Sequence, residues 1–197
     1  MHRKTFMFCL VLSLAAWGGA PETVARMVQG AQPGAGLTAS DVAWVKGGNL
    51  DGAIIIRADM YIDAPIEVVW SLVRDPNHYQ DFNKALTAHL NVLAVGQPIS
   101  LDIRMFGDEL PATNSVEMVD LVDDQNHVLS WTRDFGSGQT SERPQLLERE
   151  GTGTHFYTAL KLPSSFGWLV YITVGLGIHD AFVRFGEGLR AAAVAHP

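Results

Sequence analysis

The stretch YIDAPIEVVWSLVRDPNHYQDF, residues 61–82, carries the strongest structural signal in this chain. Apolar and polar side chains alternate through residues 53–63, which is the period-2 pattern of a half-buried strand. Pro65 suits the first helical position, because its missing N–H group would be unpaired there, and Asp63 is the expected side-chain cap. The Asp-Pro pair at 75–76 then ends that helix and starts another. The stretch therefore predicts a strand followed by two short helices.

Six further apolar runs follow, separated by short turns rich in Gly, Pro, Asp and Asn. Such short links favour antiparallel neighbours. The chain ends in a helical pattern, since Ile178, Phe182, Phe185 and Leu189 recur at intervals that place them on one face. We therefore expect an α+β fold, in which a curved antiparallel sheet of about seven strands wraps around a long C-terminal helix. The strands are expected at 53–63, 86–95, 99–106, 115–122, 128–135, 145–149 and 155–162, and the long helix at 165–195.

This pattern resembles the START/Bet v 1-like superfamily, also called SRPBCC or the polyketide cyclase/dehydrase and lipid transport group. The resemblance covers about 37–193 and rests on IDAP at 62–65, VW at 69–70, VRDP at 73–76 and the aromatic residues of the second short helix. It implies a helix-grip fold with an internal apolar cavity. It does not imply one activity, because the group includes lipid carriers, cyclases, hormone receptors and stress-response proteins.

The N-terminus has the pattern of an export signal. Basic residues at 2–4 precede a short apolar run at 6–17 and a small-residue exit at 18–25. The apolar run is short for a membrane span, although a retained anchor or a buried helix is the alternative interpretation. We therefore expect an exported protein, periplasmic or secreted. The expected domains are 1–25, a signal peptide; 26–36, a linker; and 37–197, the START/Bet v 1-like ligand-binding domain.

Charge and composition exclude several classes of function. The 197-residue chain has a net charge of -7 and no basic cluster beyond its first residues, which argues against nucleic-acid binding. Cys9 is the only cysteine and lies inside the apolar N-terminal run, so disulfides and thiolate metal sites are not expected. No motif has the spacing of a metal or cofactor site, and we expect neither.

The expected ligand is a hydrophobic small molecule or lipid held between the sheet and the long helix. Arg133 would face inward as an anchor for an anionic head, or extend to the rim of the cavity. His179 would polarise a ligand or be an ordinary helix-edge histidine, and Glu142 and Arg143 are expected as an exposed pair. No residue is given a catalytic role. The expected ligand-binding residues are Ile56, Met60, Ile103, Met105, Trp131, Arg133, Phe156, Tyr157, His179, Phe182 and Phe185.

The most apolar segment of the exported part is residues 166–178, from Phe166 to Ile178. It is either buried core or a partly exposed lid that touches a membrane transiently.

Three hypotheses follow from these patterns. The first is binding or carriage of a hydrophobic molecule in the cavity. The second is a cofactor-free cyclase or dehydratase acting on a polyketide-like substrate there, which would need an acid or base such as His179 inside the cavity. The third is a structural or partner-binding protein whose cavity is filled by its own aromatic side chains.

Overall fold

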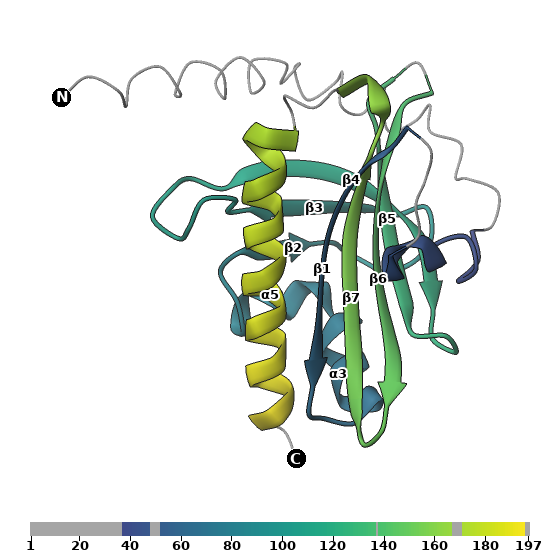
Figure 1. Ribbon diagram of the computed structural model, residues 1–197, viewed down its shortest axis with the longest axis vertical. Coiled ribbons are helices and arrows are strands. Elements are labelled where there is room, and N and C mark those ends of the chain that lie inside the picture. The colour runs from purple at the N-terminus through teal and green to yellow at the C-terminus, as the bar shows by residue number, and fades with distance from the viewer. Residues whose placement is uncertain (1–36, 48–51, 137, 167–170, 196–197) are drawn as a thin grey trace. The chain divides into compact units, whose positions relative to one another are not determined.

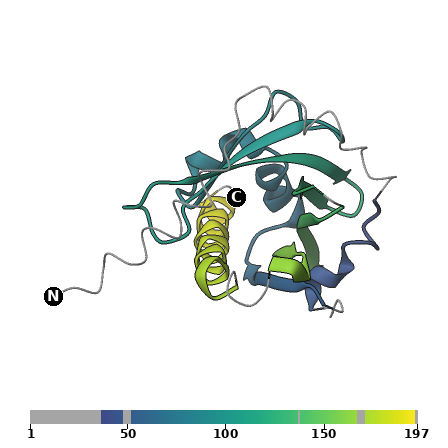
Figure 2. The ribbon, with the colours of Figure 1, turned by 90° about the horizontal axis from the view of Figure 1, so that it is seen from above.

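The computed structural model describes residues 37–47, 52–136, 138–166 and 171–195. Within these residues seven strands form one antiparallel sheet, in the order β1-β7-β6-β5-β4-β3-β2. The sheet curls around α5 (Leu176–Ala195), as Figures 1 and 2 show from two directions. The strands are β1 (Ile54–Ile62), β2 (Leu86–His89), β3 (Pro98–Ile103), β4 (Thr113–Asp123), β5 (Val128–Asp134), β6 (Thr140–Glu150) and β7 (Gly153–Leu162).

The expected helix-grip fold is confirmed. The two short helices after β1 are α3 (Ile66–Val73) and the 3-10 helix η2 (Pro76–Asp81). Short helical turns also occur at η1 (Ala43–Lys46), η3 (Ser164–Phe166) and the π-helical η4 (Tyr171–Gly175). Among the described residues, no helix has the length and apolar character needed to cross a membrane.

The entry to α3 differs from the expectation. Pro65 is the N-cap residue rather than the first helical residue, and no side chain in the described part of the chain caps the helix. Asp63 lies two positions before the cap, out of phase for the cap interaction with the first N–H groups. The Thr154 hydroxyl instead donates to the Ala64 carbonyl oxygen at 2.8 Å, which ties this corner to β7.

The bounds of two strands, β2 and β6, depart furthest from those expected. β2 ends early because the Asn77 side chain takes the place of a strand partner, bonding both the N–H and the C=O of Leu90 at 3.0 Å. β6 begins before Pro144, which a strand tolerates only where its missing N–H is not needed. The ladder from β6 to β7 has no paired residues at 143 and 144, so the proline fits.

The long helix begins at Leu176, later than expected. The π-helical η4 precedes it, and residues 167–170 lie outside the described part of the chain. The expected inner face of the helix is confirmed, because Ile178, Phe182, Phe185 and Leu189 are all buried.

The sheet buries apolar side chains on both faces. Its inner face packs on α5 and α3. On its outer face, Val42 and Trp44 from the η1 segment cover Val128 and Leu146 of the sheet. This N-terminal turn is held by Asp41, whose carboxylate accepts from both the N–H and the hydroxyl of Thr38 at 2.7 Å.

Candidate ligand-binding site

A group of polar side chains lies on the inner face of the sheet, where apolar residues would be expected. The antiparallel register aligns Val119 with Trp131, and Trp131 with Arg143. Glu117 and Gln145 lie two positions along from these residues and therefore share the same face. Four strand positions on β4, β5 and β6 thus direct charged, amide and indole groups toward α5.

A buried ion pair forms the centre of this group. Arg143 Nη2 lies 3.1 Å from Glu117 Oε1, and the two side chains are only 5% and 1% exposed. The Ser115 hydroxyl donates to the same Glu117 oxygen at 2.9 Å. Arg133 Nη1 in turn donates to Ser115 Oγ at 3.3 Å. Because Arg133 is exposed, these contacts form a polar chain from the solvent to the interior.

Several atoms of this group have no hydrogen-bond partner among the described residues. They are Glu117 Oε2, Arg143 Nε, Arg143 Nη1, Gln145 Oε1 and Trp131 Nε1, all of them buried. Buried polar atoms in native proteins are nearly always paired with protein groups or with water. A concentration of five such atoms on one inner surface therefore marks a place where another molecule can form hydrogen bonds. We call Glu117, Trp131, Arg143 and Gln145 the inner polar cluster.

Aromatic side chains surround the inner polar cluster. The Arg143 guanidinium carbon lies 5.7 Å from the centre of the Phe182 ring, within the range of a cation–π contact. Tyr79, Phe156 and Phe185 are almost completely buried. Burial raises the pKa of Tyr79, and a hydrogen bond with Gln145 opposes that rise only in part. The Tyr79 hydroxyl is thus neutral at physiological pH and donates to the Val73 carbonyl oxygen at 2.7 Å.

Most residues expected to bind a ligand do lie on the inner face. Met105 packs between the two inner apolar groups, and Arg133 lies at the rim with its guanidinium 5.0 Å from the Phe135 ring. Tyr157 differs, because it lies on the outer face, stacked on His155 with ring centres 4.3 Å apart. Adjacent strand residues point to opposite faces, so Phe156 and Tyr157 could not both face inward. The inward members are Ile56, Met60, Ile103, Trp131, Phe156, Phe182 and Phe185.

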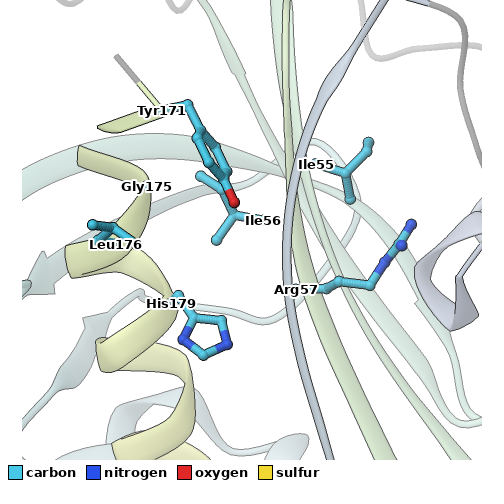
Figure 3. Close-up of a pocket in the computed structure, with 7 residues that line it drawn as sticks. All are labelled: Ile55, Ile56, Arg57, Tyr171, Gly175, Leu176 and His179. Carbon is cyan, nitrogen blue, oxygen red and sulfur yellow. The ribbon is translucent and has the colours of Figure 1, made fainter. Parts of the chain in front are cut away.

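A hollow of about 310 Å³ lies between the edge strand β1 and the start of α5 (Figure 3). Tyr171, Leu176 and His179 contribute from the helical side. Figure 3 shows Tyr171 and His179 projecting toward β1, whereas Arg57 projects from the other side of that strand. The hollow also includes Ile56, which packs in the same apolar group as Phe182. Ile56 and Phe182 therefore lie between the hollow and the inner polar cluster.

A second hollow, of about 280 Å³, lies beside α3, η2 and the end of α5. His78 Nδ1 is 2.7 Å from Asp75 Oδ2 in this hollow, and both side chains are exposed. In the described part of the chain, no group of three or more His, Cys, Asp or Glu side chains could hold a metal ion.

The sequence did not predict the inner polar cluster. Arg143 was expected in an exposed pair with Glu142, and this expectation is wrong. Glu142 faces outward and pairs with Lys161, whereas Arg143 faces inward and pairs with Glu117. The available signal was the alternation in β4, where Ser115, Glu117 and Val119 follow one another on a single face. An inward-facing glutamate between two buried positions needs a positively charged partner, and Arg143 is that partner.

Comparisons with known proteins agree on the fold. No family model matches the sequence. A 72-residue stretch is 35% identical to the abscisic acid receptor PYL10 of Arabidopsis thaliana; it covers 35% of this chain and 38% of the receptor. The match therefore spans well under half the length of this curated relative.

Solved structures match over much more of the chain. A START superfamily protein from Mycobacterium smegmatis gives a TM-score of 0.53 at 15% identity, covering 73% of this chain and 99% of that one. A major latex-like protein from Panax ginseng gives a TM-score of 0.57 at 12% identity, covering 72% of this chain and 98% of that one. Norcoclaurine synthase from Thalictrum flavum gives a TM-score of 0.53 at 15% identity, covering 74% of this chain and 96% of that one.

The protein therefore belongs to the helix-grip class, with a curved antiparallel sheet closed by one long C-terminal helix. Its fold is that of the START/Bet v 1-like superfamily, as residues 61–82 indicated.

Proposed function

We propose that the protein binds or carries a hydrophobic small molecule or lipid between the inner face of the sheet and α5. The observation that carries this proposal is the inner polar cluster, in which five atoms have no partner in the described part of the chain and lie among buried aromatic side chains. Ligand sites are mostly apolar, with a few polar groups that fix the orientation of the ligand. The apolar side chains would hold the body of the ligand and the cluster would hold its polar end.

The hollow beside β1 supports a route to this interior. It opens next to Ile56 and Phe182, which separate it from Arg143. The interior aromatic side chains are tightly packed, so the ligand displaces some of them when it enters. By its name, one relative is a receptor for a small molecule, which agrees with this proposal.

Native mass spectrometry and a fluorescent apolar probe test the proposal together. The purified protein should carry a co-purifying lipid or small molecule, or should bind N-phenyl-1-naphthylamine with an increase in probe fluorescence. Leu176→Arg should weaken or slow binding, because it places a charge at the rim of the hollow. Val194→Arg is the matched control, since Val194 is another exposed apolar residue of α5 and does not line the hollow. A protein that is empty and does not bind the probe would support a filled, structural interior.

Catalysis is the second candidate function, and Glu117 is the observation that favours it. An enzyme acting in the interior needs an ionisable group there, and the Glu117 carboxylate is present with one free oxygen. One protein with a similar fold is named as a synthase. Recovery of a bound ligand chemically unchanged after long incubation would favour carriage over catalysis.

We also propose that the protein is exported. The basic, apolar and small-residue order of residues 1–25 supports this proposal, and these residues lie outside the described part of the structure. N-terminal sequencing of protein recovered from the cell envelope or the medium should begin at Arg26. A mature protein that begins at Met1 would indicate a retained segment.

A transient membrane contact through residues 166–178 is proposed for ligand exchange. Tyr171 and Ile172 in η4 and Leu176 at the start of α5 are exposed apolar side chains, whereas Ile178 is buried. Residues 167–170 lie outside the described part. Co-sedimentation with vesicles of zwitterionic phosphatidylcholine should fall when Ile172 is replaced by Asp. Equal sedimentation of both proteins would contradict the contact.

A further inference from the structure

We infer that the inner polar cluster selects a hydroxyl group at the polar end of the ligand and discriminates against a carboxylate. This inference rests on the proposed function, because it concerns the polar end of the ligand proposed there. It is carried by the charge balance of the cluster and by the donors and acceptors that the cluster leaves free.

The charge balance disfavours an anionic ligand. Arg143 and Glu117 neutralise each other at 3.1 Å, and both side chains are nearly fully buried. A carboxylate arriving beside them would bring a second negative charge to one guanidinium. An uncompensated charge in a buried site is costly, whereas an uncharged group adds no charge. Arg133 does not change this balance in the interior, because its exposed charge at the rim is hydrated and screened.

The free hydrogen-bonding atoms indicate which uncharged group fits. Within the described residues, Arg143 Nε, Arg143 Nη1 and Trp131 Nε1 are donors without a partner, and Glu117 Oε2 and Gln145 Oε1 are acceptors without one. A hydroxyl both donates and accepts, so it can pair with both sets. A carboxylate or an ether only accepts, and it would leave the two acceptor oxygens unpaired. Leaving a buried polar group unpaired costs free energy that a hydroxyl would recover.

Three probes with similar chains separate these chemistries. The full-length protein is loaded with N-phenyl-1-naphthylamine, and 1-decanol, decyl methyl ether and decanoate are compared as competitors at about pH 8, where decanoate is ionised. We expect 1-decanol to displace the probe at about tenfold lower concentration than the ether, the gain of one well-made hydrogen bond. The ether is the more apolar of the two, so a purely hydrophobic site would prefer it. Decanoate should be the weakest competitor.

Glu117→Gln changes the charge of the cluster. It removes the negative charge and leaves Arg143 uncompensated, so decanoate should gain at least about tenfold relative to 1-decanol. Glu67→Gln is the matched control, because Glu67 pairs with Arg149 of the same strand β6 in an exposed ion pair. The control should keep the wild-type order of the three competitors.

The comparison of the three competitors with wild-type protein tests the inference by itself, even if Glu117→Gln does not fold. The inference is overturned if decanoate matches 1-decanol in the wild-type protein, or if the ether equals or exceeds it. If the naphthylamine binds but the competitors do not differ, the proposed function stands and only the hydroxyl selection fails. If neither the naphthylamine nor any competitor binds, both proposals fail.

Discussion

His155 lies between two carboxylates on the outer face of the sheet. Its Nδ1 is 2.7 Å from Glu150 Oε2 and its Nε2 is 2.9 Å from Asp59 Oδ2. Burial alone would lower the pKa of His155, but the hydrogen bonds with Asp59 and Glu150 outweigh it and raise the pKa. A raised histidine pKa means that the folded state binds the proton more tightly than the unfolded state does. The arrangement therefore stabilises the fold only when His155 is protonated.

The prediction for His155 concerns the pH dependence of stability. Its contribution should be fully present below the unfolded pKa of about 6.5 and should be lost as pH rises through the higher folded pKa. His155→Gln should therefore cost about 0.5–1 kcal/mol of unfolding free energy near pH 5 and little near pH 9, since both carboxylates are exposed. Urea unfolding at both pH values measures this difference. His179→Gln is the control, and an equal loss at both pH values would contradict the prediction.

Asp120 is the opposite case, a carboxyl group that burial disfavours in its charged form. It lies at a β-bulge between Val119 and Leu121, and its Oδ2 accepts a hydrogen bond from the Thr132 hydroxyl. Burial raises the pKa of Asp120, and the hydrogen bond from Thr132 offsets only part of that effect. The ionised side chain therefore destabilises the fold at neutral pH.

Asp120→Asn should stabilise the protein by on the order of 1 kcal/mol at neutral pH, because it removes the buried charge and keeps an acceptor for Thr132. The gain should disappear below the ordinary aspartate pKa of 3.8, where the wild-type side chain is protonated in both states. Thermal unfolding at the two pH values provides the measurement. Asp63→Asn, at an exposed position, should have little effect. A loss of stability at neutral pH would show that the Asp120 carboxylate is favourable.

At the scale of the elements, β4 and β6 are joined through β5 and by the buried pair of Glu117 and Arg143. Arg143→Met should cost about 3–5 kcal/mol, since it leaves a buried carboxylate without its cation. Arg149→Met on the same strand should cost little stability, because its pair with Glu67 is exposed to solvent.

The double variant Glu117→Leu/Arg143→Met completes this test. Replacing both charges with apolar groups should recover most of the stability lost in Arg143→Met, because no unpaired charge remains. Denaturant unfolding of the wild type, Glu117→Leu, Arg143→Met and the double variant gives the coupling energy. If the double variant is as unstable as the single one, packing rather than charge explains the loss.

The elements were largely predictable from sequence, whereas the polar site was not. Period-2 alternation identified β1, and the four-three-four spacing identified the inner face of α5, because each pattern repeats within one element. The inward position of Arg143 was not predicted, because its partner Glu117 lies on another strand. Only the register between the strands brings the two side chains together. Tyr157 was predicted on the wrong face for a related reason: a shift of one residue along a strand moves a side chain to the opposite face of the sheet.

At the scale of the whole molecule, α5 comes very close to the backbone of the connection between η2 and β2 at Gly188. A Cβ atom on Gly188 would overlap the Phe82 carbonyl oxygen and lie 2.9 Å from Asn83 Cβ. Asn83 is buried and holds this connection, because its side chain bonds the Tyr79 carbonyl and the Leu86 N–H at 2.7 Å. Moving either the Phe82 backbone or the Asn83 side chain would therefore cost folding free energy.

Gly188→Ala should therefore destabilise the protein by about 1–3 kcal/mol or more, as overpacked sites do. Gly186→Ala is the matched control on the same helix, where the atoms nearest to the new methyl group belong to the flexible side chain of Met60. The loss of stability in Gly186→Ala should be smaller than that in Gly188→Ala. Thermal unfolding of the two variants checks the order, and equal losses would indicate a general intolerance of α5 rather than one tight contact.

The strand order has a consequence for how the protein is made. β1 pairs along its whole length with β7, so that Ile54 faces Leu162 and Ile62 faces Thr154. Among the described strands, β1 is made before the other six and pairs with β7 alone, which is made after them. At about 5–20 residues per second, its edge waits for several seconds. Throughout that interval β1 lacks its partner β7 in the nascent chain and is open to chaperones, and the described seven-stranded sheet is complete only after β7 has been made.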